Sequence, residues 1–133
     1  MVAAPRALSA VALVPLCALL LMSCAFFDPR SVLDPQTDFG SDVFLLPETE
    51  APTDVTASVC ANIDGCERAA ESQRVRILRF ANTDRAEVVA RSLGSAGYLS
   101  DRFVIEYLDP SVTDEQRRYV ESAVDHTATW DSD

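Results

Sequence analysis

Lysine is absent from this chain of 133 residues, and its charge is strongly one-sided. All 11 basic residues are arginine and 21 residues are aspartate or glutamate, so the formal net charge is −10. This excess of negative charge repels phosphate backbones, which argues against a nucleic-acid partner. Arginine in place of lysine, together with abundant alanine, is typical of a GC-rich bacterial genome.

Glycine and histidine are also scarce. Four glycines leave little from which to build a phosphate-binding loop, and the sequence has neither a dinucleotide fingerprint nor a nucleophile-elbow pentapeptide. The single histidine, His126, excludes a zinc-binding histidine pair. His126 is the first candidate for a general base, but near a predicted helix C-terminus it serves more simply to complement the helix dipole. The sequence therefore predicts no metal and no cofactor.

Two groups of oxygen-bearing side chains are further candidates for a site. Asp114 and Glu115 could form a pair for acid–base chemistry, but they fall in the first turn of a predicted helix, where acidic residues are common. Asn62, Asp64 and Gly65 resemble the start of a calcium loop without the rest of its ligand spacing. Neither group has the pattern of a catalytic or metal site, so neither leads us to predict an enzyme.

Charge is missing altogether from residues 7–27, an uncharged run of 21 residues that follows Arg6. A positive N-terminal region followed by an apolar region is the layout of a secretory signal. About 20 apolar residues suffice to cross a bilayer, so an uncleaved membrane helix is the competing interpretation. A plain cleaved signal is a third.

The end of this apolar run favours the first interpretation in a particular form. Residues 21–24, Leu-Met-Ser-Cys, resemble the lipobox of bacterial lipoproteins. The resemblance covers only the first 24 residues, and it implies that the Cys24 sulfur receives a diacylglyceryl group. It also implies that a peptidase cuts between Ser23 and Cys24. Cys17 lacks this context and is interpreted as a small apolar residue of the signal.

A lipid at Cys24 would place the protein on the outer side of the cell membrane. A diacylglyceryl group supplies two acyl chains, the number that stable attachment requires, and each buried methylene contributes about 0.8 kcal/mol. We therefore divide the chain into a signal peptide (1–23), a lipidated N-terminus with an acidic, proline-rich linker (24–57) and a small extracytoplasmic domain (58–133).

The linker is defined by its composition. Residues 28–57 contain four prolines and seven acidic residues against one arginine, a composition that predicts an extended, solvated chain. Four consecutive apolar residues interrupt it within 42–46. We expect this short run to dock on the folded domain as a strand, the alternative being an adhesive motif for a partner.

Two cysteines remain for the folded part. With Cys24 acylated and Cys17 removed, Cys60 and Cys66 are left in an oxidising compartment, so a disulfide is expected. Free thiols are the main alternative. Two cysteines cannot fill a tetrahedral zinc site, and their spacing is not that of thiol oxidoreductases.

Secondary structure follows from local patterns. Residues 66–72 suit a short helix, and residues 75–80 and 103–108 suit strands. A helix is predicted to begin near 82–84, with a capping box between Asp84 and Glu87, and to stop at Gly94. A second capping box, Thr113 with Gln116, begins a helix that runs to about 127.

Strand, helix, strand and helix within about 60 residues predict an α+β fold, a small two-layer domain with helices on one face of the sheet. A right-handed crossover is expected if the two strands are parallel. Because two strands make a thin sheet, a further strand is expected from 98–99, from 42–46 or from a second molecule. Arg74, Arg76 and Arg79 are interpreted as charges on a solvated sheet edge, and Trp130 is expected to fold back onto the core.

Three functions remain open at this point. The leading prediction is a non-enzymatic lipoprotein that binds another protein or a ligand of the cell envelope. The second is an accessory envelope enzyme that uses His126 or a pair of carboxylates. The third is a structural protein that associates with itself through a sheet edge.

Overall fold

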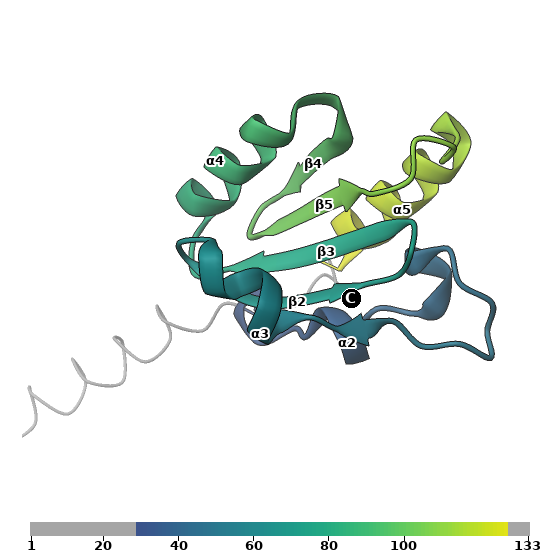
Figure 1. Cartoon of the computed structure of the whole chain (residues 1–133), viewed down its shortest axis with the longest axis horizontal. Helices are drawn as coiled ribbons and strands as arrows, with labels where there is room; N and C mark the ends of the chain where they lie inside the picture. The colour runs from purple at the N-terminus through teal and green to yellow at the C-terminus, as the bar shows by residue number, and fades with distance from the viewer. Residues whose placement is uncertain (1–28, 128–133) are drawn as a thin grey trace, which may run out of the picture.

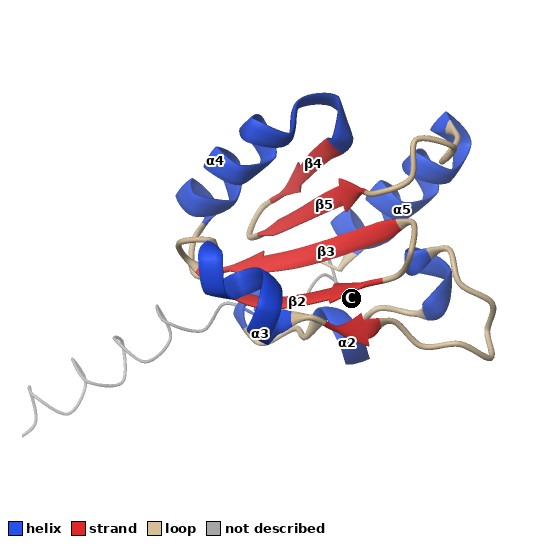
Figure 2. Ribbon diagram, viewed as in Figure 1, coloured by secondary structure: helices blue, strands red, loops and turns tan. Residues whose placement is uncertain are grey.

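A five-stranded antiparallel sheet organises the protein, whose computed structural model describes residues 29–127 (Figure 1). The strand order is β1-β2-β3-β5-β4. The strands are β1 Thr53–Asp54, β2 Cys66–Glu71, β3 Val75–Phe80, β4 Gly97–Ser100 and β5 Phe103–Tyr107. Helices accompany the sheet along its length (Figure 2), and the predicted α+β class is confirmed.

The central strand β3 contributes buried side chains to two separate cores, one on each face of the sheet. Side chains alternate across a strand, so Val75 and Ile77 point to one face of the sheet and Leu78 and Phe80 to the other. All four are almost completely buried. Both faces are therefore covered, and the predicted two layers become three.

The first face lies under helix α5, Asp114–His126. The predicted capping box is present, with Thr113 and Gln116 bonding reciprocally, and Val120 and Val124 are fully buried in the core. As the alternation in 103–108 predicted, Phe103, Ile105 and Tyr107 of β5 point to this face.

The opposite face lies under α4, Thr83–Leu93, and the short helix α3, Thr56–Val59. The N-cap of α4 is Asn82, whose side chain accepts a hydrogen bond from the Arg85 amide, so the helix begins before the predicted Asp84 box. The helix ends at Gly94 as predicted, at a positive φ of 58° that favours glycine.

The predicted helix over 66–72 is wrong, because these residues form β2. Ala69 pairs with Leu78 and Ala70 with Ile77 in the antiparallel ladder with β3. Both alanines are buried, one on each face, since the sheet is covered on both sides. Pairing with the strand that follows directly in the chain, together with burial on both faces, has overridden a local helical preference.

The structure differs most from the sequence prediction in the region expected to be a solvated linker. Residues 29–46, called here the N-terminal segment, fold against the first face as the 3₁₀ helix η1 (Pro29–Ser31), the helix α2 (Pro35–Asp38) and the 3₁₀ helix η2 (Ser41–Phe44). Phe39, Val43 and Phe44 are 6%, 5% and 0% exposed and belong to the first core. The folded domain thus includes residues well before the predicted boundary at 58.

The apolar run at 42–46 docks as predicted, although as η2 and not as a strand. The further strand comes instead from β4, which includes the predicted 98–99. Since β3 and β5 are antiparallel neighbours, no crossover joins them. Cys17, Cys24 and Trp130 lie outside the described residues.

Candidate functional site

The structure does not bring the predicted catalytic candidates together. His126 is exposed, and its Nδ1 lies 3.3 Å from the Ser122 hydroxyl of the same helix. Asp114 and Glu115 are exposed in the first turn of α5. His126 is 12 residues further along the helix than Asp114, about 18 Å at 1.5 Å per residue. These side chains cannot act on one substrate atom.

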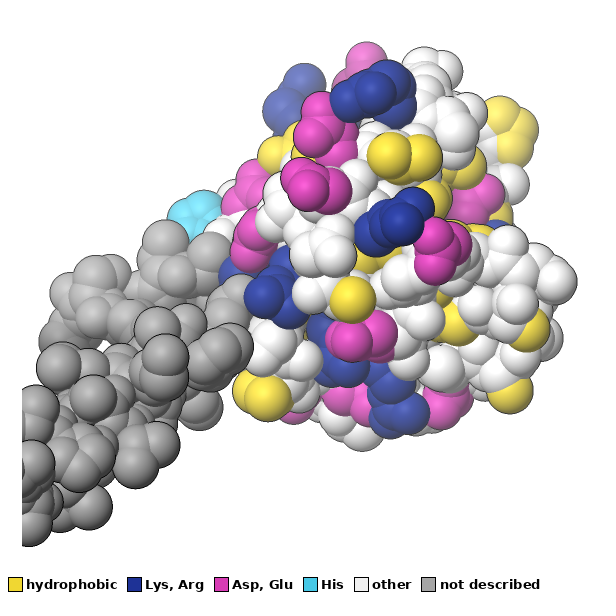
Figure 3. All heavy atoms as spheres, turned by 90° about the vertical axis from the view of Figure 1, so that its left-hand side faces the viewer, with side chains coloured by type: hydrophobic (Ala, Val, Ile, Leu, Met, Phe, Trp, Pro, Cys, Tyr) yellow, Lys and Arg dark blue, Asp and Glu magenta, His cyan; other side chains and the backbone are white. Residues whose placement is uncertain are grey.

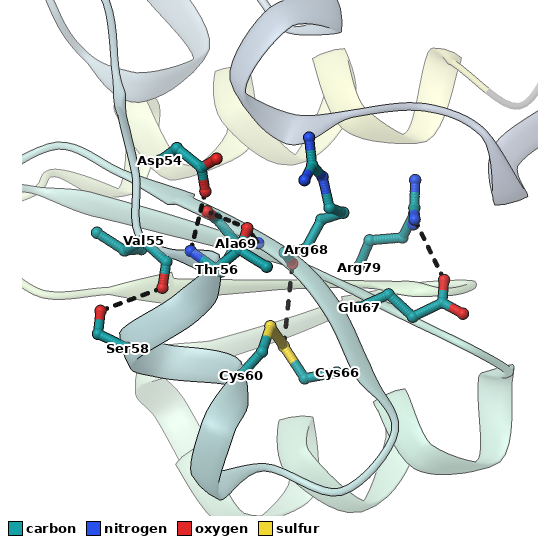
Figure 4. Close-up of a disulfide and its surroundings, with 10 residues drawn as sticks. All are labelled: Asp54, Val55, Thr56, Ser58, Cys60, Cys66, Glu67, Arg68, Ala69 and Arg79. Carbon is teal, nitrogen blue, oxygen red and sulfur yellow. Dashed lines mark hydrogen bonds and ion pairs between the residues drawn. A yellow bond between two sulfur atoms is a disulfide. The ribbon is translucent and has the colours of Figure 1, made fainter.

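A disulfide joins Cys60 and Cys66, as predicted, with their Cα atoms 5.0 Å apart (Figure 4). It connects the end of α3 to the start of β2 and closes a loop in which Gly65 adopts a positive φ of 79°. Ile63 of this loop packs against the second core together with both cysteines. The loop, residues 60–66, is called here the cystine loop.

The calcium-like residues of the cystine loop are engaged in other ways. Asp64 pairs with Arg85 of α4 at 2.8 Å, and Asn62 is exposed. Among residues 29–127, no group of three His, Cys, Asp or Glu side chains is arranged to hold a metal ion. The Asp64–Arg85 pair instead links the cystine loop to the first turns of α4.

A groove of about 450 Å³ lies between the cystine loop and α4, above β3. Apolar side chains form much of its lining, namely Ile63, Leu78, Val88, Val89 and Leu93. Four charged side chains also line it: Asp64 and Arg85 from the paired loop and helix, and Arg76 and Glu106 from the sheet. Val88 is 57% exposed, an unusual position for a large apolar residue beside a cavity.

The sheet end of the groove carries a row of alternating charges. Arg76 donates to Glu71 of β2 at 2.7 Å and to Glu106 of β5 at 3.0 Å. Desolvation by itself lowers the pKa of Arg76, but the hydrogen bond to Glu71 and the charge of Glu106 outweigh it and raise the pKa. The guanidinium is therefore a fixed positive group between two carboxylates.

The interpretation of Arg76 and Arg79 as edge charges is wrong, because both lie on β3, the central strand; Arg74 precedes β3 in the β2–β3 turn. Besides Arg76, Arg74 lies 3.0 Å from Gln116 and Arg79 lies 3.2 Å from Glu67. Charged side chains are accommodated on a central strand here because each finds a partner on a neighbouring element.

A second cavity, of about 590 Å³, lies where β2 turns into β3. Its lining includes Leu45, Glu50, Glu71 and Arg74 and is largely polar. Of the two cavities, the groove beside α4 has the apolar floor and the few charged groups that are typical of binding sites. We therefore take it as the candidate functional site.

The most perturbed tyrosines lie on the other face of the sheet. A hydrogen bond to Asp125, together with burial, raises the pKa of Tyr98 to about 12. Burial raises the pKa of Tyr107 well above its usual value, and the nearby Glu121 adds to the effect. Both hydroxyls tie the sheet to α5, and neither residue lines the groove.

Sequence reasoning missed the groove because its walls come from three separate parts of the chain. Val89 and Leu93 lie on the face of α4 that packs against the second core, and they also line the groove. The local signal that could have marked the site is Val88, an apolar residue next to that face. The closure of the cystine loop against α4 has no local signal.

Comparison with known proteins identifies no relative of this chain. No protein-family model, no curated protein and no solved structure matches the chain. Within residues 29–127, none of the helices combines the length and the apolar character needed to cross a membrane.

Proposed function

We propose that the protein is a lipoprotein, held on the extracytoplasmic face of the cell membrane by a diacylglyceryl group on Cys24, and that it works as a non-enzymatic binding or accessory module of the cell envelope. The Leu-Met-Ser-Cys motif supports the anchor. The Cys60–Cys66 disulfide supports the compartment, because disulfides persist outside the reducing cytoplasm.

The groove is the observation that carries the binding role. Its apolar floor accepts an aliphatic or aromatic side chain of a partner, and the flanking charges accept polar groups beside it. The Cys60–Cys66 disulfide closes the loop that forms one wall, and the charge row on the sheet orders the other, before a partner arrives. A preformed site of this kind avoids part of the ordering cost of binding.

Two valines allow a matched test of the groove. Val88 lines it and is 57% exposed, whereas Val32 is 66% exposed and does not line it. The protein and its Val88→Asp and Val32→Asp variants are captured from detergent-solubilised envelopes, and the copurifying proteins are identified by mass spectrometry. We expect Val88→Asp to lose a partner that Val32→Asp keeps. Equal recovery of every partner by all three proteins would contradict the groove as the site.

The anchor has its own test. The intact mass of the membrane-extracted protein is expected to correspond to a chain that begins at a lipid-modified Cys24, and Cys24→Ala is expected to leave the membrane fraction. A chain that retains Met1 with an unmodified Cys24 would contradict the lipoprotein proposal.

A further inference from the structure

Arg30, at the start of the described chain, is locked into the fold. Its side chain is only 8% exposed, and Nη2 donates to the Ser100 hydroxyl at 3.0 Å and to the Val124 carbonyl at 3.1 Å. Nη1 lies 3.6 Å from the Asp101 carboxylate, and the guanidinium sits 5.1 Å from the centre of the Phe103 ring. One side chain thus joins β4, the β4–β5 turn, β5 and α5.

The chain just after Arg30 is held as well. Arg79 of β3 donates to the Leu33 carbonyl at 2.8 Å, and Arg68 of β2 forms an ion pair with Asp34. Residues 30–34 are therefore fixed at three successive points to three different strands or turns. The N-terminal segment cannot swing away without breaking these contacts and exposing the aromatic residues that follow.

Only residues 25–29 separate Cys24 from Arg30. Six Cα-to-Cα steps of at most about 3.6 Å give a reach of about 20 Å from the lipid-bearing residue to the fold. Two of the five intervening residues, Phe26 and Phe27, have large apolar side chains, which favour burial at the boundary between headgroups and acyl chains. The predicted tether of some 30 residues is thus reduced to a very short one.

The same contacts determine which part of the domain is nearest to Cys24. Arg30 lies at the end of the sheet where β4 turns into β5, beside the end of β3, because Arg79 pairs with Phe103. We call this end the Arg30 pole; Thr83, whose hydroxyl donates to Asp101, also belongs to it. The β2–β3 turn at Gln73 lies at the other end, about 20 Å away at 3.3 Å per residue along β3.

We propose that the Arg30 pole docks on the lipid surface, so that the domain stands on the membrane in one orientation with the β2–β3 turn pointing outward. The inference rests on the proposed lipid at Cys24. Its partner is the bilayer itself, and the short, fixed connection is what selects the pole. Figure 3 shows this side of the molecule, on which acidic and basic side chains are interspersed. Such a surface has no single strong charge to repel or attract anionic lipids.

This orientation has a consequence for binding. The polar cavity beside the β2–β3 turn, lined by Glu50 and Arg74, opens at the end of the domain that faces away from the bilayer. The groove beside α4 lies between the two ends, because its lining extends in space from Asp64 of the cystine loop to Glu106 of β5. A partner would thus meet the groove from the side, close to the membrane.

Two variants of the full chain, each with one added cysteine, test the orientation. Asp84→Cys places a thiol at the Arg30 pole, and Gln73→Cys places one at the opposite end; both native residues are exposed. In the lipidated protein Cys24 is blocked and Cys60–Cys66 is oxidised, so a fluorophore reacts only at the new position. The labelled proteins are reconstituted into vesicles with and without lipids that carry a nitroxide quencher on the headgroup.

The expected result is loss of most of the fluorescence from the Asp84→Cys label and retention of most of it by the Gln73→Cys label. As a control, 20 Gly and Ser residues inserted between Phe27 and Asp28 extend the tether by about 25 Å on average, and this insertion should abolish the difference. Equal quenching of the two labels without the insertion would overturn the docked orientation. The intact mass of the same samples separates the two proposals: equal quenching on a lipid-bearing chain refutes the orientation alone, whereas a chain without lipid refutes the lipoprotein and the orientation together.

Discussion

The N-terminal segment provides the sharpest test of the fold, through the substitution Phe44→Ala. Phe44 is fully buried in the first core, yet it belongs to a stretch whose composition predicts a solvated linker. Truncation of a buried phenylalanine removes its transfer free energy and leaves a cavity, which together cost about 3–5 kcal/mol. Truncation of a side chain in a solvated linker would change the free energy of unfolding by almost nothing.

The size of this effect is large for so small a domain. The described part, residues 29–127, has 99 residues. At about 0.05–0.15 kcal/mol per residue, its free energy of unfolding is about 5–15 kcal/mol. Each kcal/mol shifts the Tm of a domain of this size by about 4–8 °C, so Phe44→Ala should lower the Tm by at least about 12 °C.

The assay is urea and thermal unfolding of a soluble fragment that begins at Asp28, followed by circular dichroism. Val32→Ala is the matched control, because Val32 lies in the same segment and is 66% exposed. It should change the free energy of unfolding by no more than about 0.5 kcal/mol. If Phe44→Ala cost less than about 1 kcal/mol, the packing of the N-terminal segment described here would be refuted.

Three further perturbations test other contacts in the same unfolding assay. Arg30→Ala leaves the Ser100 hydroxyl and a carbonyl without their donor and should cost about 2–3 kcal/mol, and Arg30→Lys should recover only part of it because the ammonium lacks the guanidinium fork; full recovery would argue against the geometry. Replacement of both Cys60 and Cys66 by alanine should cost about 2 kcal/mol through the closed loop, and no loss would show that the disulfide is not formed. Folding raises the pKa of Tyr98 to about 12, so the unfolded chain loses the phenolic proton at a lower pH than the folded protein does. The free energy of unfolding should therefore fall between pH 10 and pH 12, and it should fall less in Tyr98→Phe. The same pH profile in Tyr98→Phe and in the unsubstituted protein would contradict the hydrogen bond to Asp125.

Features with short-range causes could be predicted from the sequence. The capping box of Thr113 and Gln116 starts α5, and Gly94 ends α4, because each signal acts within one helical turn. The strand β5 follows from its alternating apolar residues. The disulfide follows from the count and spacing of the cysteines.

The helix predicted over 66–72 and the solvated linker predicted over 28–57 were wrong for the same physical reason. Residues 66–72 have a local preference for helix, but pairing with β3 buries Ala69 and Ala70 and decides for a strand. The run at 42–46, which contains Phe44, was expected to dock, but the acidic composition of the N-terminal segment hides Phe39, whose burial in the first core is decided by the tertiary structure. Composition averages over residues, whereas burial selects individual ones.

By itself, the sequence determined the α+β class, the two longer helices, the strands β3 and β5 and the partner of each folded-domain cysteine, since these depend on contacts between residues close in the chain. Only the tertiary structure decided that both faces of the sheet are covered, that the cystine loop and α4 enclose a groove, and that Arg30 fixes the domain a few residues after Cys24. Each of these brings together segments far apart in the chain, and the cost of closing such loops is repaid only by the packing of the complete core.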